Sequence, residues 1–260
     1  MSKYDCKIIR SGSTLEVIKF GSSVVSDSEI NKSPPIGRSR DALEADKIIN
    51  RCQVMRRARS EVRRLINANS GQWKDIKDRF YKPVFMTLTF ADNIQDFDTA
   101  NHEFRLFMLR LGNMINDRKH RGSLQYVVVP EFQKRGAIHY HLVIFNLPYV
   151  SSKSIADCWG NGFIKLKAID QVDNVGAYIC KYMGKDLDDE RLRAKKCYFS
   201  SRNLLKPEVM QFDTTRIGQK EMLESVIKTA QALLRKKPYR VEYPSEYYGS
   251  ITYTQYTLKD

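Results

Sequence analysis

The sequence predicts an α+β fold, because stretches typical of β-strands occur together with stretches of helical periodicity. VFMTLTF at 84–90 is rich in β-branched and aromatic residues, as buried strands are. Two further strand-like runs, 124–133 and 137–146, are separated by Lys134-Arg135-Gly136, which is typical of a hairpin loop with Gly in the left-handed position. Residues 98–117 predict a flanking helix. Its apolar residues recur at helical spacing: Phe104, Phe107, Met108, Leu111 and Ile115.

The composition is that of an ordinary globular protein with a surplus of positive charge. Of 260 residues, 44 are Lys or Arg and 30 are Asp or Glu, which gives a formal charge of +14. The 42% of hydrophobic residues excludes an intrinsically disordered chain. The sequence has neither an apolar run of about 18 residues nor an export signal, so we expect a cytoplasmic protein without a membrane partner. The charge predicts a polyanionic partner, most often nucleic acid.

The N-terminal part predicts a hairpin followed by a long helix. Residues 4–20 alternate apolar and polar positions around Ser11-Gly12-Ser13, and 21–37 has the Ser and Pro content of a loop. Residues 40–67 predict the helix, and one of its faces is basic. The basic residues are Lys47, Arg51, Arg56, Arg57, Arg59, Arg63 and Arg64. This face either is simply solvated or follows a nucleic-acid backbone, and the presence of Glu61 as the one acid among these residues favours the backbone.

The remaining elements follow in order. We expect a short helix at 151–158, a strand at 162–169, a helix at 174–186 and a helix at 217–236. The segment 238–256 is rich in Tyr and close to several cations. Its tyrosines either stack exposed bases or are ordinary strand residues.

Two of the four histidines, His139 and His141, lie two residues apart on a predicted strand. Side chains two apart point to the same face of a strand. In the register that the hairpin loop sets, Glu131 lies opposite His139, where cross-strand Cβ atoms are about 4.5–5.5 Å apart. Two imidazoles and one carboxylate suit Mg²⁺ or Mn²⁺ and would equally accept Zn²⁺ or Co²⁺. The alternative is that the two imidazoles only form hydrogen bonds within the sheet, and a bulge at Pro130 would move Glu131 out of register.

The helix at 174–186 carries a second candidate group. Tyr178 and Tyr182 share one face, and Lys181 and Lys185 each follow a tyrosine by three residues. A phenol becomes a useful nucleophile when nearby cations stabilise its phenolate. The alternative is an amphipathic helix that packs its aromatic stripe.

VFMTLTF, EFQKRGAIHYHLVIF and AYICKYMGKD, in this order, resemble the three motifs of HUH endonucleases. More closely, they resemble rolling-circle replication initiators of bacterial plasmids and of filamentous or small single-stranded DNA phages. The resemblance spans roughly residues 47–206. It implies a central five-stranded antiparallel sheet flanked by helices, with the metal site on the central hairpin and the tyrosine helix beside it. The positions that match metal ligands are Glu131, His139 and His141. The positions that match the nucleophiles and their lysines are Tyr178, Tyr182, Lys181 and Lys185.

The resemblance also implies an activity. Such a protein nicks one strand of origin DNA by a Mn²⁺- or Mg²⁺-assisted transesterification, which leaves a 5′-phosphotyrosine and a free 3′-hydroxyl. The partners are single-stranded or hairpin origin DNA, gripped by the basic helix, with a helicase and a polymerase of the bacterial host. A G-x-x-x-x-G-K-[ST] phosphate loop is not found in the sequence, so unwinding is left to that helicase or to supercoiling.

Two alternatives stay open. A double-tyrosine transposase or a mobilisation nickase would use the same chemistry on another DNA, and a DNA-binding regulator would use the site only for packing. We expect four segments along the chain. They are an N-terminal hairpin and loop (1–37), a basic helical segment (38–80), a nuclease core (81–206), and a C-terminal helix with tyrosine-rich strands (207–260).

Overall fold

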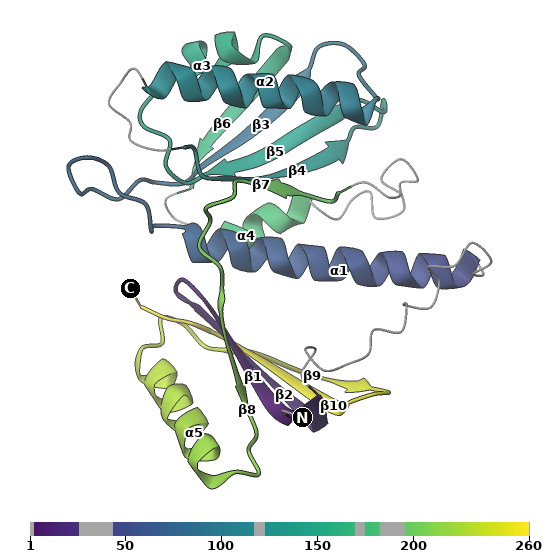
Figure 1. The fold of residues 1–260 in the computed structure, drawn as a ribbon, viewed down its shortest axis with the longest axis vertical. Coiled ribbons are helices and arrows are strands. Elements are labelled where there is room, and N and C mark those ends of the chain that lie inside the picture. The colour runs from purple at the N-terminus through teal and green to yellow at the C-terminus, as the bar shows by residue number, and fades with distance from the viewer. Residues whose placement is uncertain (1–2, 26–43, 117–122, 170–174, 183–195, 260) are drawn as a thin grey trace. The chain divides into compact units, whose positions relative to one another are not determined.

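The chain folds into two compact units (Figure 1). A computed structural model describes residues 3–25, 44–116, 123–169, 175–182 and 196–259. The central unit comprises 44–205, and the terminal unit combines 1–43 with 206–260. Each unit contains a five-stranded antiparallel sheet with helices, which confirms the predicted α+β class and the predicted five-stranded sheet.

The strands of the central unit lie in the order β6-β3-β5-β4-β7. The strands are β3 (Val84–Phe90), β4 (Tyr126–Phe132), β5 (Ile138–Ile144), β6 (Gly162–Ala168) and β7 (Phe199–Ser200). The helices are α1 (Glu44–Asn69), α2 (Phe97–Asn116), α3 (Ser152–Trp159) and α4 (Val175–Ile179), which continues into the 3₁₀ turn η1 (Cys180–Tyr182). The elements predicted for this unit are present, except that the expected helix at 174–186 becomes 3₁₀ after Ile179, and residues 183–186 lie outside the described part. The short strand β7 was not predicted.

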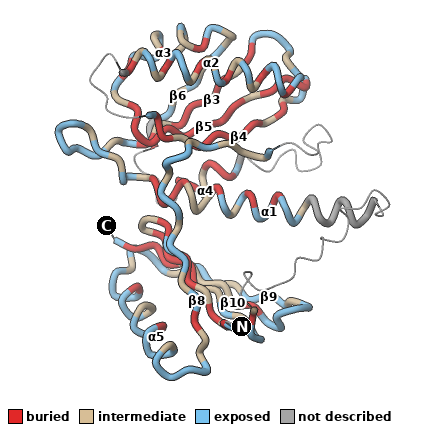
Figure 2. Tube along the Cα trace, viewed as in Figure 1, coloured by how far each residue is buried: buried red, intermediate tan, exposed pale blue. Residues whose placement is uncertain are grey.

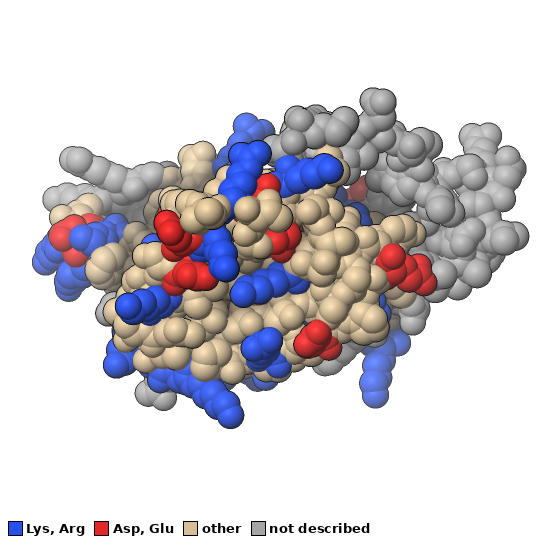
Figure 3. All heavy atoms as spheres, turned by 90° about the horizontal axis from the view of Figure 1, so that it is seen from below, with Lys and Arg blue, Asp and Glu red and all other residues tan. Residues whose placement is uncertain are grey.

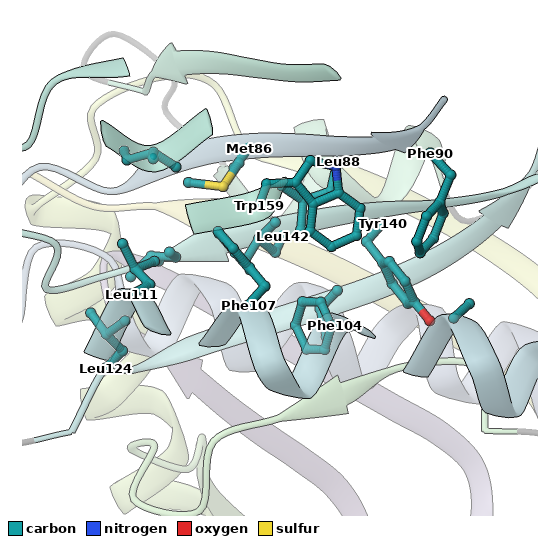
Figure 4. Packing of buried hydrophobic residues seen from close by; sticks show 14 of the residues in the cluster. Met86, Leu88, Phe90, Phe104, Phe107, Leu111, Leu124, Tyr140, Leu142 and Trp159 are labelled. Atoms are coloured by element: carbon teal, nitrogen blue, oxygen red, sulfur yellow. The ribbon is translucent and has the colours of Figure 1, made fainter. Parts of the chain in front are cut away.

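Helices α2 and α3 cover one face of the central sheet, and α1 and α4 cover the other (Figure 1). Residues alternate between the two faces along each strand, so that Met86 and Leu88 of β3 enter the core under α2 while Phe85 enters the core under α1. Figure 4 shows the first core, where the rings of Phe107 and Trp159 lie 5.6 Å apart. Figure 2 shows the central strands as the most buried part of this unit.

The β4–β5 hairpin has the predicted loop. Gly136 has φ +90°, and the backbone N–H of Gln133 donates to the oxygen of Ala137 at 2.8 Å. Pro130 pairs with Tyr140 in an unbroken register, so the expected bulge is absent from this described hairpin. The reason is that β7 pairs with β4 only at Val127 and Val128, so Pro130 lies where β4 is a sheet edge and its missing N–H costs little.

The terminal unit joins the two ends of the chain in one sheet. Its strands are β1 (Lys3–Ser11), β2 (Thr14–Val25), β8 (Glu208–Phe212), β9 (Tyr239–Ser245) and β10 (Gly249–Thr257), in the order β8-β1-β2-β10-β9. Helix α5 (Ile217–Ala232) packs Leu223 and Ala230 against Ile8 and Val17 of this sheet. The predicted hairpin is confirmed, with Gly12 at φ +57° in its turn.

Two expectations for the terminal unit were wrong. A loop was expected from residue 21, but β2 continues through Val25, because pairing with β1 at Tyr4 overrides the low strand propensity of the serines. Strand β8 was not predicted, although its register with β1 runs from Glu208 to Phe212. Among the helices that the structure describes, none has an apolar stretch long enough to cross a membrane.

Candidate active site

The predicted register between β4 and β5 is confirmed. Glu131 pairs with His139, and Val129 pairs with His141. On the other side of β5, Thr89 of β3 pairs with His139 and Thr87 pairs with His141. The two histidines, Glu131 and the two threonines therefore lie on the face of the sheet that α1 and α4 partly cover.

His141 is held on three sides. Its Nε2 contacts the carboxylate of Glu131, one step along the sheet from the residue directly opposite, and its Nδ1 lies 3.2 Å from Oγ1 of Thr87. The ring of Phe85 stacks on the imidazole at 5.8 Å with 5° between the planes. The side chain is 5% exposed, so its orientation is set by packing as well as by hydrogen bonds.

His139 is buried differently. Its ring lies 6.3 Å from that of His141, and its Nε2 is buried without a hydrogen-bond partner in the described part of the chain. Burial lowers the pKa of His139 to about 4, with a further contribution from His141, against a smaller opposing effect of Glu131. The imidazole is therefore neutral near pH 7, which is the form that binds metal ions.

The donor chemistry of the three residues fits a divalent ion. A buried nitrogen without a partner is costly unless something binds it, and Nε2 of His139 is such an atom. Within the described residues, however, no group of three or more His, Cys, Asp or Glu side chains is placed so as to hold a metal ion as it stands. Glu131 and His141 contact each other instead. The metal site of Glu131, His139 and His141 thus stays a prediction.

Tyr178 of α4 reaches the same face of the sheet. Its ring makes an edge contact with Phe85, with centroids 6.2 Å apart. Nζ of Lys167 donates a hydrogen bond to the phenol oxygen at 3.1 Å. Lys181 lies over the tyrosine ring, 5.6 Å from its centroid, as the shared helix predicts. The side chain of Tyr182 and the whole of Lys185 lie outside the described residues.

Three residues of this site were not found in the sequence. Phe85 and Thr87 lie in VFMTLTF, and their alternation with buried residues already placed them on one face. The partner of that face became known only from the pairing of Thr87 with His141. Lys167 gave the weakest signal, because GFIKLKA alternates like any edge strand with a solvated side.

Helix α4 is held close to α1. The backbone N–H of Gly176 donates to the side-chain oxygen of Asn67 at 2.9 Å, and Sγ of Cys180 lies 3.3 Å from the carbonyl oxygen of Arg59. A Cβ atom at Gly176 would lie 2.2 Å from the carbonyl oxygen of Arg63. Tyr178 is therefore positioned by a contact between helices that only a glycine allows.

The basic helix has a buried face and an exposed one. Met55, Ala58, Val62 and Ile66 are buried. The predicted DNA-binding residues that the structure describes lie elsewhere on the helix: Arg56, Arg57 and Arg59 are exposed, and Arg63 and Arg64 are half-buried. The side chain of Arg51 lies outside the described part. On the face drawn in Figure 3, Lys and Arg side chains are scattered, with acidic ones among them.

Residues 83–187 match the family model of the replication-associated protein ORF2. The matched segment contains β3, the β4–β5 hairpin and α4, and thus every candidate catalytic and metal-binding residue. This match supports a family of replication initiators. No curated protein and no solved structure matches the chain.

Proposed function

We propose that the chain is a replication initiator that nicks one strand of DNA by attack of a tyrosine on a phosphodiester. The matched family makes DNA replication the process. The observation that carries the nicking activity is the placement of Tyr178 and the Glu131–His141 pair on one sheet face, in contact with the same ring, Phe85. A nucleophile and a set of metal-ligand side chains are thereby held beside each other by a rigid sheet.

The chemical step transfers the DNA strand to the protein. The phenol oxygen of Tyr178 or Tyr182 forms a bond to phosphorus, and its proton leaves to solvent. The bond from phosphorus to the 3′-oxygen breaks, and that oxygen takes up a proton. The products are a 5′-phosphotyrosine link and a 3′-hydroxyl that primes synthesis. Because one phosphodiester replaces another, the reaction needs no ATP and is reversible.

Glu131, His139 and His141 would hold Mn²⁺ or Mg²⁺, which supplies charge stabilisation at a non-bridging oxygen of the scissile phosphate. The protein's own contribution is to keep the donors in place. Thr87 and Glu131 fix the ring of His141, and burial keeps His139 neutral.

The exposed arginines of α1 are the proposed grip on the DNA backbone. Arg56, Arg57 and Arg59 project from the same helix that holds α4 in place, so a strand bound along them passes near the tyrosine helix. The substrate is a single strand, because the phosphate must be reached from the sheet face.

The test is a covalent adduct with a random-sequence pool of single-stranded DNA and Mn²⁺, resolved on a denaturing gel. DNA labelled at its 3′ end should stay on the protein, and DNA labelled at its 5′ end should be released with a 3′-hydroxyl. The adduct should vanish with chelator, with His139→Ala and with Tyr178→Phe combined with Tyr182→Phe. An adduct that survives the double tyrosine change would refute the proposed nucleophiles.

The alternatives give other outcomes. A DNA-binding regulator would bind the pool and form no adduct under any metal. A transposase or mobilisation nickase would form the same adduct, and the sequence selected from the pool would then match the ends of a mobile element or a transfer origin instead of a replication origin. The matched replication-associated family favours the replication origin.

A further inference from the structure

Lys167 contacts the proposed nucleophile in two ways. Its Nζ donates a hydrogen bond of 3.1 Å to the phenol oxygen of Tyr178, and it lies 5.0 Å from the centroid of the ring. The lysine comes from the edge strand β6, where it pairs with Phe85, and the tyrosine comes from α4. The contact therefore joins two elements that only the fold brings together.

We infer that Lys167 is a catalytic residue of the nicking step and that Tyr178 is the tyrosine that attacks first, an inference that rests on the proposed function. A phenol must lose its proton while its oxygen bonds to phosphorus. A cation that donates a hydrogen bond to this oxygen stabilises the negative charge that develops on it. Lys181 contributes a second positive charge over the ring, 5.6 Å from its centroid.

The geometry also explains why a lysine from the sheet performs this role. The Nζ of Lys167 is bonded to the reacting oxygen itself, whereas Lys181 belongs to the same helical segment as Tyr178 and lies over its ring. Phe85 pairs with Lys167 across the strands and contacts the tyrosine ring at its edge. The phenol is thus held between an aromatic ring and a cation, with its oxygen on the cation.

The chain offers a matched control. Lys165 lies two residues earlier on the same strand and the same face, pairs with Thr87, and is exposed like Lys167. Lys165→Met and Lys167→Met remove the same charge from the same strand. Lys167→Arg keeps the charge and the hydrogen-bond donors.

The first measurement is the single-turnover rate of adduct formation at saturating DNA, together with DNA affinity. We expect Lys167→Met to lower the rate about tenfold, the effect of losing one partly solvated charged hydrogen bond. DNA affinity should change no more than in Lys165→Met, whose rate should be close to that of the unchanged chain. Lys167→Arg should recover most of the rate, and peptide mapping should place the DNA mainly on Tyr178.

The second measurement needs no DNA. An arylsulfonyl fluoride transfers its sulfonyl group to a phenol oxygen, with loss of fluoride and a proton, and mass spectrometry reads the labelled tyrosine. Tyr178 should label more slowly in Lys167→Met than in Lys165→Met. Equal labelling in both variants, or an adduct mainly on Tyr182, overturns the inference while the proposed function stands. Absence of any adduct overturns the proposed function, and the labelling rates then still decide whether Lys167 activates Tyr178.

Discussion

The side-chain oxygen of Asn67 accepts a hydrogen bond of 2.9 Å from the backbone N–H of Gly176. Gly176 lies in the first turn of α4, where backbone N–H groups have no partner within the helix, so a residue of α1 caps the tyrosine helix from outside. Both groups are buried. The position of Tyr178 therefore depends on the contact between α1 and α4.

Gly176→Ala tests this contact. The added Cβ would lie 2.2 Å from the backbone oxygen of Arg63, which cannot move without shifting α1. We expect the free energy of unfolding to fall by about 1–3 kcal/mol and adduct formation to fall with it. Gly112→Ala is the control, because a Cβ there meets nothing within 4 Å and α2 should gain about 0.5–1 kcal/mol. Chemical denaturation of both variants measures the difference, and equal stability would contradict the close contact.

Glu131→Gln tests the proposed metal ligands. The amide keeps the size of the side chain but removes the negative charge, so Mn²⁺ affinity measured by isothermal titration calorimetry should fall at least about tenfold. Asp157→Asn removes an exposed carboxylate from α3, on the opposite side of the sheet, and should leave the affinity unchanged. The same affinity in both variants would argue against Glu131 as a ligand.

The basic helix should set the salt dependence of DNA binding. Arg56→Gln combined with Arg57→Gln removes two exposed charges from α1 and should weaken binding to all single-stranded sequences alike. The slope of log affinity against log salt should decrease by about 0.7 for each phosphate that the variant no longer neutralises. Arg105→Gln with Lys153→Gln removes two exposed charges from α2 and α3 and is the matched pair. Fluorescence anisotropy at several salt concentrations measures both, and identical slopes would exclude α1 as the surface that binds the DNA backbone.

The thiol of Cys180 reports on the same helix contact. Burial raises its pKa from 9.0 to about 11, partly offset by the nearby Arg59 and Arg63. At pH 8, iodoacetamide should therefore label Cys180 at least about tenfold more slowly than the half-buried Cys52, because only the thiolate reacts. The folded state holds this proton more tightly than the unfolded chain. Its contribution to stability is therefore complete below pH 9.0 and is lost as the pH rises toward about 11. Rapid labelling of Cys180 at pH 8 would mean that α4 separates readily from α1.

Local patterns in the sequence were sufficient for the hairpin at the centre of the site. The loop Lys134-Arg135-Gly136 and the period of two along each strand determine that Glu131 lies opposite His139, and the structure confirms this register. The helical spacing of Phe104, Phe107 and Leu111 likewise predicted their burial, and they are 5%, 0% and 0% exposed. In each case the relevant neighbours are near in sequence, so the geometry of one hairpin or one helix is enough.

Only the tertiary structure decided which residues meet across distant segments. The sequence by itself determined the order of strands and helices, the face that His139 and His141 share, and the basic side of α1. It did not determine that β1 and β2 pair with strands from the other end of the chain, nor that Lys167 of β6 bonds to Tyr178 of α4. The physical reason is that pairing between distant strands and packing between helices depend on the whole set of buried surfaces, whereas alternation and turn chemistry act over a few residues.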